Sequence, residues 1–387
     1  MAQFEELDRV LVQILNGQSL PLLSEFCSED RWQQLYQRAQ RHGLAPLVYW
    51  HARQGRLPIP QPLFEQFKQA YLATLARNRI FYNELERVVS ALTGQGIAVV
   101  LLKGAMFARM LYEDIGLRPM SDLDILVRKT DIPQAVSLLK ENGYIEPVLH
   151  QSELLKQDVT HDVHLRQSQP PNVDIEVHWL LVGGERFRQK TDMDWFWQRV
   201  VPFEGWPEGV YTLSPTAHLL YLCGHLGFQH GLGSIGLLWL VDIRRFLAKY
   251  KHVIDWEEFV AGAKHHSWSA SAYYTFREVQ KYFLQAPPET VLEQLRFQMT
   301  PEEEKQVIAL SRMAPSRVGL AWTQFHQLDW AAKLRNVIGR LFPSLAFMRQ
   351  RYGFRSNWQA ILGYPIRWVD LMQVFLKYLQ ARNKGKR

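Results

Sequence analysis

Two short apolar runs constrain the fold of this chain most, because they interrupt a sequence that is otherwise patterned for helices. Residues 97–104, IAVVLLKG, and residues 122–127, DLDILV, are rich in β-branched and aliphatic residues and are too short for typical helices. Gly94 and Gly96 end the helical pattern before the first run. We therefore predict two buried strands with a helix between them, over residues 105–115.

Helical periodicity dominates both sides of these strands. Apolar residues recur at helical spacing over residues 1–92 and again in the second half of the chain. In between, the alternation of apolar and polar residues in HDVHLRQ (161–167) and NVDIEVHW (172–179) predicts two further strands. The predicted fold class is α+β, with a small mixed β-sheet in a core over residues 93–190, flanked by an N-terminal helical region and a C-terminal helical domain over residues 191–387.

Length and composition indicate a globular protein. The chain has 387 residues, of which 47% are hydrophobic and 21% charged, enough for a well-buried core. The first residues, MAQFEELDRVLVQIL, are acidic and amphipathic, unlike a signal peptide, and no apolar run is long enough to span a bilayer. Cys27 and Cys223 form no CxxC motif, which argues against a disulfide framework or a cysteine zinc site. We expect a cytoplasmic protein.

Positive charge is concentrated at the C-terminal end of the chain. Residues 331–387 contain twelve Lys or Arg and one acid, Asp370, so their net charge is +11 while residues 1–330 carry −4. Such a basic tail attracts anions without reading their sequence, and its partner could be RNA, an anionic membrane surface or an acidic protein. The other interpretation is a solvated basic end of a helical domain.

The second predicted strand carries two aspartates on one face. Side chains alternate along a strand, so Asp122 and Asp124 point the same way while Leu123 and Ile125 point the other way. Two neighbouring carboxylates repel each other unless a cation neutralises them. Mg²⁺ fits this role, because it prefers oxygen ligands and is commonly bound by one or two carboxylates together with substrate phosphates.

Residues around these strands offer contacts to a phosphate chain. Lys103 and Gly104 lie where the first strand meets a helix, and helix N-termini bind anions through backbone amides and the helix dipole. The glycine lets a phosphate approach the backbone closely, and the lysine adds a positive charge. Arg118 offers a planar fork just before the aspartates, and Ser121 directly precedes Asp122. We predict that Lys103, Gly104, Arg118 and Ser121 bind a nucleotide.

A third acid is expected from the last predicted strand of the core. In NVDIEVHW, Asp174, Glu176 and His178 share one face, and apolar residues share the other. A carboxylate from this strand would complete a two-metal site with Asp122 and Asp124. Such sites stabilise the attacking and the leaving oxygen of an in-line phosphoryl transfer.

Five motifs that occur in order carry a resemblance to a known family. They are LLKGA, GLRPMSDLDILV, IEVHW, HLLYLCGHLGFQH and LVDIRRFL, and they extend over roughly residues 35–270. The pattern resembles the bacterial uncharacterised nucleotidyltransferase family of the DNA polymerase β-like nucleotidyltransferase superfamily. The resemblance implies that Asp122, Asp124 and Glu176 are catalytic and bind two Mg²⁺ ions, which Mn²⁺ can replace.

The resemblance also implies that Lys103 and Gly104 form the triphosphate-binding turn. Glu176 is preferred to Asp174 as the third metal ligand because it directly precedes the VHW of the family pattern, but Asp174 stays open as an alternative. Members of the superfamily commonly have Gly-Ser or Gly-Gly at this turn. Here Ala105 follows Gly104, so the hydroxyl contact to phosphate is missing, and Lys103 is the candidate to replace it.

Several histidines are further candidates for substrate contacts. His218 and His225 are seven residues apart, on one face of a predicted helix, and His230 follows. They either line the substrate site, as the resemblance favours, or lie in the core, or bind zinc, although no recognised zinc motif is present. His161 and His164 either contact substrate or lie on an edge strand. The predicted substrate-lining residues are Asp174, His178, His164, His225 and His230.

The reaction implied by the resemblance is nucleotidyl transfer from an NTP such as ATP, with release of pyrophosphate. The acceptor is a small molecule, a peptide or protein, or an RNA, and these residues do not distinguish among them. The alternative is a non-catalytic protein of the same fold that binds or assembles with an anionic partner through its basic C-terminal tail.

Overall fold

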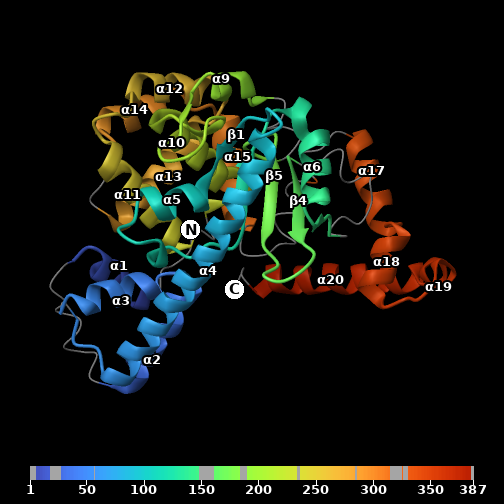
Figure 1. Cartoon of the computed structure of the whole chain (residues 1–387), viewed down its shortest axis with the longest axis horizontal. Coiled ribbons are helices and arrows are strands. Elements are labelled where there is room, and N and C mark those ends of the chain that lie inside the picture. Colours follow the sequence, from blue (N-terminus) through green and yellow to red (C-terminus); the bar gives the residue numbers. More distant parts are fainter. Residues whose placement is uncertain are drawn as a thin grey trace.

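A seven-stranded mixed sheet lies at the centre of the molecule. The computed structural model (Figure 1) describes residues 6–17, 28–55, 57–147, 161–183, 190–232, 236–283, 286–313, 325 and 330–384. The strand order is β3-β4-β5-β2-β1-β7-β6. The strands are β1 (Val99–Leu101), β2 (Leu123–Leu126), β3 (Tyr144–Ile145), β4 (Asp162–Gln167), β5 (Asp174–His178), β6 (Val200–Pro202) and β7 (Val210–Leu213). The predicted α+β class, with a mixed sheet between helical regions, is confirmed.

Alternation along the central strands separates an apolar face from a polar face. β2 pairs parallel with β5, which puts Asp124 opposite Glu176. β4 pairs antiparallel with β5, which puts His164 opposite Glu176 on its other side. Ile125 and Ile175 belong to the alternate set and are fully buried. The candidate polar residues of three neighbouring strands therefore share one face of the sheet.

The N-terminal region is helical, as predicted. It contains α1 (Glu6–Leu15), α2 (Glu29–Arg41), α3 (Ala45–Arg53) and the long helix α4 (Gln61–Thr93). In Figure 1, α1 to α3 gather around one end of α4, whose other end runs alongside the sheet. Asn78 on α4 donates hydrogen bonds to the carbonyls of Ile115 and Arg118 at 2.5 and 2.8 Å. The helix is thereby fixed to the loop that leads into β2.

The segment from β1 to β2 follows the predicted order of strand, helix and strand. α5 (Lys103–Met110) follows β1, and a 3₁₀ turn (Ile115–Leu117) leads to β2. A second 3₁₀ turn (Lys129–Asp131) and α6 (Ile132–Glu141) follow. Gly143, two residues past α6, has φ +88°, the left-handed conformation that commonly ends a helix.

Two strands occur where the sequence indicated only helices. β6 and β7 lie within residues 200–213, and β7 pairs parallel with β1 at the centre of the sheet. The sheet thus extends beyond residue 190, where we placed the end of the core. The division into three regions remains a prediction.

The rest of the chain is helical and lies on two sides of the sheet. The first group is α9 (Met193–Trp197), α10 (Pro215–Gly224), the π-helix η4 (His225–His230), α11 (Leu237–Tyr250), α12 (Trp256–His265), α13 (Ser269–Tyr282), α14 (Glu289–Gln298) and α15 (Pro301–Met313). The second is α17 (Trp330–Leu341), α18 (Leu345–Tyr352), α19 (Asn357–Leu362) and α20 (Tyr364–Lys384). In Figure 1, α17 to α20 lie across the sheet from α11, α12 and α14.

Two expectations about composition can be compared with this architecture. Within the described part of the chain, no helix has the length and apolar character needed to cross a membrane. Cys223 is fully buried in α10, as predicted for a small hydrophobic residue, and burial raises the pKa of its thiol. Cys27 lies outside the described residues.

Candidate functional site

A cavity of about 520 Å³ opens between the polar face of the sheet and helices α4, η4 and α11. Its sheet side is formed by residues of the β1–α5 junction, of the loop into β2, and of β2, β4 and β5. The lining residues are Lys103, Gly104, Arg118, Pro119, Met120, Ser121, Asp122, Asp124, His161, Asp162, Glu176 and His178, with Arg77, His225, Gln229, His230, Leu238 and Trp239 from the helices. All predicted catalytic and nucleotide-binding residues therefore line one cavity.

Two of the three predicted metal ligands lie side by side. Because β2 and β5 pair in register, Asp124 and Glu176 project next to each other from adjacent strands. The candidate ligand atoms of Asp124, Glu176 and His178 all lie within 4.8 Å of one another. Asp124 is nearly inaccessible to solvent, with 4% of its surface exposed. This group is compact enough for its ligand atoms to surround a cation.

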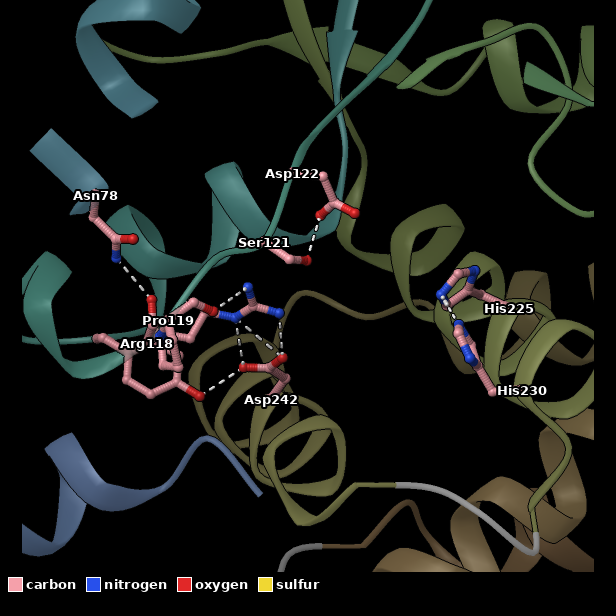
Figure 2. A network of polar contacts seen from close by, with 9 residues as sticks. Asn78, Arg118, Pro119, Ser121, Asp122, His225, His230 and Asp242 are labelled. Atoms are coloured by element: carbon pink, nitrogen blue, oxygen red, sulfur yellow. Dashed lines mark hydrogen bonds and ion pairs between the residues drawn. The ribbon is translucent and has the colours of Figure 1, made fainter. Parts of the chain in front are cut away.

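Asp122 lines the same cavity but is not part of that compact group. Its Oδ1 accepts a hydrogen bond from the hydroxyl of Ser121 at 2.9 Å, as Figure 2 shows. Burial, together with the negative charges of Asp124 and Glu176, raises the pKa of Asp122 to about 6. The repulsion expected between neighbouring carboxylates is thus present, and it falls mainly on Asp122.

Lys103 neutralises Asp124 in this structure. Its Nζ lies 3.0 Å from Asp124 Oδ1. Burial alone would lower the pKa of Lys103, but the attraction of Asp124 outweighs it and holds that pKa above its ordinary value. The backbone of Lys103 has φ +27°, in the left-handed region that non-glycine residues rarely adopt. Such outliers gather at functional sites, where the surrounding structure enforces them.

His178 is the second cation beside the acids. Its Nε2 lies 3.1 Å from Asp124 Oδ1 and 3.4 Å from Glu176 Oε2. Burial lowers the pKa of His178, but its hydrogen bonds to these carboxylates outweigh burial and raise it to about 9. Burial would raise the pKa of Asp124, yet Lys103 and His178 hold it well below its ordinary range. Asp124 is therefore ionised, and Lys103 and His178 are the protein cations that lie against it.

Arg118 lines the cavity and is held in place by an ion pair with Asp242. Its Nη2 lies 2.9 Å from Asp242 Oδ2, and Nε lies 3.3 Å from both carboxylate oxygens of Asp242 (Figure 2). Tyr112 donates its hydroxyl to the same carboxylate at 2.6 Å. A Cβ added at Gly104 would lie 3.0 Å from Arg118 Nη1. The absent side chain at position 104 therefore makes room for this guanidinium, as well as opening the turn.

Asp174 and His164 do not line the cavity. Asp174 accepts two hydrogen bonds from Arg166, at 2.6 and 2.8 Å, and lies 3.3 Å from His164 Nε2. Arg166 lowers the pKa of Asp174 through these hydrogen bonds. Of the two candidate third acids, Glu176 is the one beside Asp124, and Asp174 belongs to a separate ion pair.

The histidines of α10 and η4 separate into two sets. His225 and His230 line the cavity, and their Nε2 atoms lie 3.0 Å apart, on the opposite side of the view in Figure 2 from Ser121. A π-helix forms i to i+5 hydrogen bonds, which brings residues five apart onto one face. His218 instead is fully buried against Phe107 and Phe246. The metal-sized groups found among described residues include none of these histidines.

Burial keeps His225 and His230 neutral, unlike His178 on the sheet side of the cavity. It lowers the pKa of His230 to about 4 and holds the pKa of His225 well below its ordinary value. His225 is 8% exposed, and its Nδ1 has no hydrogen-bond partner. His225 and His230 therefore line the cavity as uncharged rings.

Sequence reasoning did not single out several residues of the cavity wall, among them Arg77, Asp162, Gln229 and Trp239. Trp239 packs on His230 with ring centroids 4.0 Å apart. Asp162 could have been found, since it shares the strand face of His164. Arg77 lies in a long helical pattern, and nothing in its local sequence marks it as a cavity residue.

The class of protein that this fold and cavity define is nucleotidyltransferase-like. Residues 28–284 match the family described as uncharacterised nucleotidyltransferases. Since the match covers more than half of the chain, the protein belongs to this family, as its motifs predicted.

Other known proteins add little to this assignment. No curated protein matches the chain. One solved structure with some similarity is an antigenic nucleotidyltransferase-like protein from Paracoccidioides brasiliensis. It is 15% identical, the match covers 55% of this chain and 97% of that one, and the TM-score is 0.29. A likeness of this size carries no argument about this chain.

Proposed function

We propose that this protein is an Mg²⁺-dependent nucleotidyltransferase, which transfers a nucleotidyl group from an NTP to an acceptor and releases pyrophosphate. The observation that carries the proposal is the convergence of Asp124, Glu176 and Asp122 in one cavity beside the N-terminus of α5. Family membership supports the reaction class. The acceptor attacks the α-phosphorus through an oxygen, the bond from that phosphorus to the bridging oxygen breaks, and the acceptor loses its proton.

The acid cluster has the donor chemistry that a hard divalent cation requires. Asp124 and Glu176 present adjacent carboxylates, and Asp122 adds a third in the same cavity. Lys103 and His178 now supply the positive charge beside these oxygens. Bound Mg²⁺ supplies neutralisation of the triphosphate and of the charge that develops during transfer. Asp122, Asp124 and Glu176 would hold it.

The triphosphate has a complementary surface next to these acids. The residue before α5 is Leu102, and no side chain caps the helix there, so the amides of its first turn are available to an anion. Lys103 lies in this turn, and Arg77 lines the same cavity from α4. Gly104 leaves the turn without a side chain that would hinder phosphate. These groups bind and orient the leaving pyrophosphate.

The histidine side of the cavity is proposed to receive the acceptor or the base of the nucleotide. His225 and His230 are neutral, so they offer hydrogen bonds without adding charge. Trp239 adds an aromatic surface next to His230. An uncharged polar and aromatic wall suits a ring or a hydroxyl group better than a phosphate.

Substitution of the acids tests the proposal against a matched control. Purified protein is incubated with each α-³²P-labelled NTP, Mg²⁺ and a cell extract as the source of acceptors, and incorporated label is measured. We expect Asp124→Asn and Glu176→Gln to lower incorporation by about 100-fold or more, because each removes charge from the reacting centre. Asp174→Asn, on the same strand face but outside the cavity, should retain activity. Equal labelling by wild type and both cavity variants would refute the proposal.

A non-catalytic binding protein of the same fold is the alternative, and ligand-induced stabilisation separates the two. A ligand that binds only the folded state raises its melting temperature by mass action. An active enzyme should be stabilised by an NTP only when Mg²⁺ or Mn²⁺ is present, and Glu176→Gln should abolish the effect. The absence of stabilisation by all four NTPs would favour the non-catalytic protein.

A further inference from the structure

The last helices of the chain form an arm with its own internal contacts. We call residues 330–384, comprising α17 to α20, the C-terminal arm. Trp368 Nε1 on α20 donates to the carbonyl of Leu341 at 3.0 Å, and Tyr364 donates its hydroxyl to the carbonyl of Pro343 at 2.8 Å. Tyr352 on α18 donates to Asp370 Oδ2 at 2.9 Å. These bonds connect α17, α18 and α20 to one another.

The arm exposes far more apolar surface than the rest of the molecule. Among the described residues, fourteen of the twenty exposed large hydrophobic side chains lie between positions 330 and 376. Within the arm the most exposed are Trp330, Leu362 and Trp358, with 79%, 78% and 76% of their surface accessible. α20 adds Met372 and others. A concentration of exposed apolar side chains in one segment of a globular protein indicates an interaction site.

The net positive charge of the same segment restricts the kinds of partner that it can bind. Residues 331–387 contain twelve basic residues and one acid, while the rest of the chain is net acidic. The single acid, Asp370, is held within the arm by Tyr352 and by Arg367, whose Nη1 lies 3.6 Å away. The partner must therefore present negative charge and an apolar phase together.

Three kinds of partner are compatible with part of this surface. A second copy of the arm, which has ten Lys or Arg and one acid in residues 330–384, would bring an equal net charge of +9 against the first, which is repulsive. RNA would satisfy the charge, but aliphatic side chains such as Leu362 and Met372 have no stacking surface to offer to bases. An anionic membrane satisfies both properties, since its headgroups attract Lys and Arg while its acyl region accepts apolar side chains.

We propose that the C-terminal arm binds the surface of a membrane rich in anionic lipids. It lies in the interface without crossing the bilayer, with its tryptophan and aliphatic side chains inserted at headgroup level and its basic residues beside the phosphates. Tryptophan is enriched at this depth because its ring is amphipathic. The proposal does not depend on the proposed transfer reaction, since no residue of the arm lines the catalytic cavity.

Co-sedimentation of the full chain with vesicles tests this proposal. One set of vesicles contains phosphatidylcholine alone, and the other contains phosphatidylcholine with phosphatidylglycerol. We expect binding to the second set, accompanied by a blue shift of tryptophan fluorescence and weakened by added salt. Trp358→Ser and Leu362→Ser should each lower the affinity by about tenfold, since each removes one inserted apolar side chain. Both positions are exposed, so these variants should fold.

A matched control distinguishes the arm from apolar surface in general. Phe297 on α14 is 94% exposed and lies outside the arm, so Phe297→Ser should bind vesicles like wild type. The absence of binding to anionic vesicles, or an equal loss with Phe297→Ser, would refute the proposal. A stable dimer in sedimentation equilibrium that Leu362→Ser dissociates would also refute it. So would RNA binding that Trp358→Ser abolishes, if neither wild type nor this variant binds vesicles.

Discussion

Two Arg–Asp pairs near the cavity differ in burial, and burial determines what each pair does for the molecule. The guanidinium of Arg118 and the carboxylate of Asp242 are both almost completely buried. They join the loop before β2 to α11, which belongs to the helical region after the sheet. Arg166 and Asp174 form an even shorter pair, but the side chain of Arg166 is about half exposed at 48%. Only the charges of Arg118 and Asp242 have both lost their contact with water. Removal of one partner therefore leaves an unpaired buried charge only in this first pair.

The difference predicts unequal losses of stability at the scale of single residues. Asp242→Asn leaves the buried charge of Arg118 without its counterion and should lower the free energy of unfolding by about 3 to 5 kcal/mol. Asp174→Asn removes the partner of a half-exposed arginine and should lower it by less than about 1 kcal/mol. Urea denaturation of both variants measures the difference. Similar small losses would mean that Arg118 is satisfied by the Pro119 carbonyl and by water.

At the scale of whole helices, one carboxylate fastens the first helix to the second. Asp8 on α1 is 2% exposed and accepts hydrogen bonds from Arg38 of α2 at 2.7 and 2.8 Å. His42, which caps the C-terminus of α2, lies 3.1 Å from the same carboxylate, and its Nδ1 accepts from the amide of Leu237 at 3.4 Å. α1, α2 and the start of α11 are thus connected through two side chains.

This connection predicts a loss of stability in acid. Burial would raise the pKa of Asp8, but the hydrogen bonds from Arg38 and His42 outweigh it and lower the pKa from 3.8 to about 2. Because the folded state has the lower pKa, the stabilisation is complete above pH 3.8 and is lost as the pH falls toward 2. It amounts to about 2 kcal/mol of unfolding free energy.

The measurement compares wild type with Asp8→Asn over the same pH range. Asparagine does not titrate, so the variant should be less stable by about 2 kcal/mol at neutral pH, and the gap should close as the pH falls from 4 toward 2. Denaturant midpoints recorded at each pH give this gap. A constant difference across that range would show that Asp8 acts through packing and not through its charge.

Elements with a regular period could be predicted from the sequence, whereas those fixed by distant contacts could not. Alternation predicted that Asp122 and Asp124 share one face of their strand and that Glu176 and His178 share one face of theirs, because side chains on a strand repeat every two residues. β6 and β7 lie in VVPFEGWPEGVYTL (200–213), where Pro and Gly interrupt the apolar pattern, and β7 is defined by pairing with β1 about a hundred residues earlier. The π-helix could not be predicted from the sequence either, since its apolar pattern resembles that of an α-helix.

In the candidate site, too, the contacts that depend on distant parts of the chain could not be predicted from the sequence. Lys103 was predicted to bind phosphate from its place before a glycine, but its ion pair with Asp124 depends on the pairing of β1 with β2. The choice between Asp174 and Glu176 depended on a motif. In the structure, Arg166 stands opposite Asp174 in the hairpin of β4 and β5 and forms an ion pair with its carboxylate. Glu176 instead stands opposite Asp124. Local sequence identifies the residue types of a site, while strand register determines which of them meet.

At the scale of the whole molecule, the two proposed functional surfaces lie apart. The cavity is lined by residues between positions 77 and 239, and the arm begins at position 330. α19, which carries Trp358 and Leu362, lies at the outer end of the arm, across α20 from α4 (Figure 1). Residues this far apart with no shared partners usually affect stability and binding independently.

This separation predicts that each activity can be removed without the other. Leu362→Ser should lose vesicle binding but keep the Mg²⁺-dependent stabilisation by NTP, because every lining residue of the cavity is unchanged. Glu176→Gln should lose that stabilisation but bind anionic vesicles like wild type, and the double variant should show both losses, additive within about 0.5 kcal/mol. Thermal shift and co-sedimentation on the same four proteins measure both properties. If Leu362→Ser also lost NTP stabilisation, the arm and the cavity would be coupled through the body of the protein, and a membrane-bound state would then differ from the free state at the acids of the cavity.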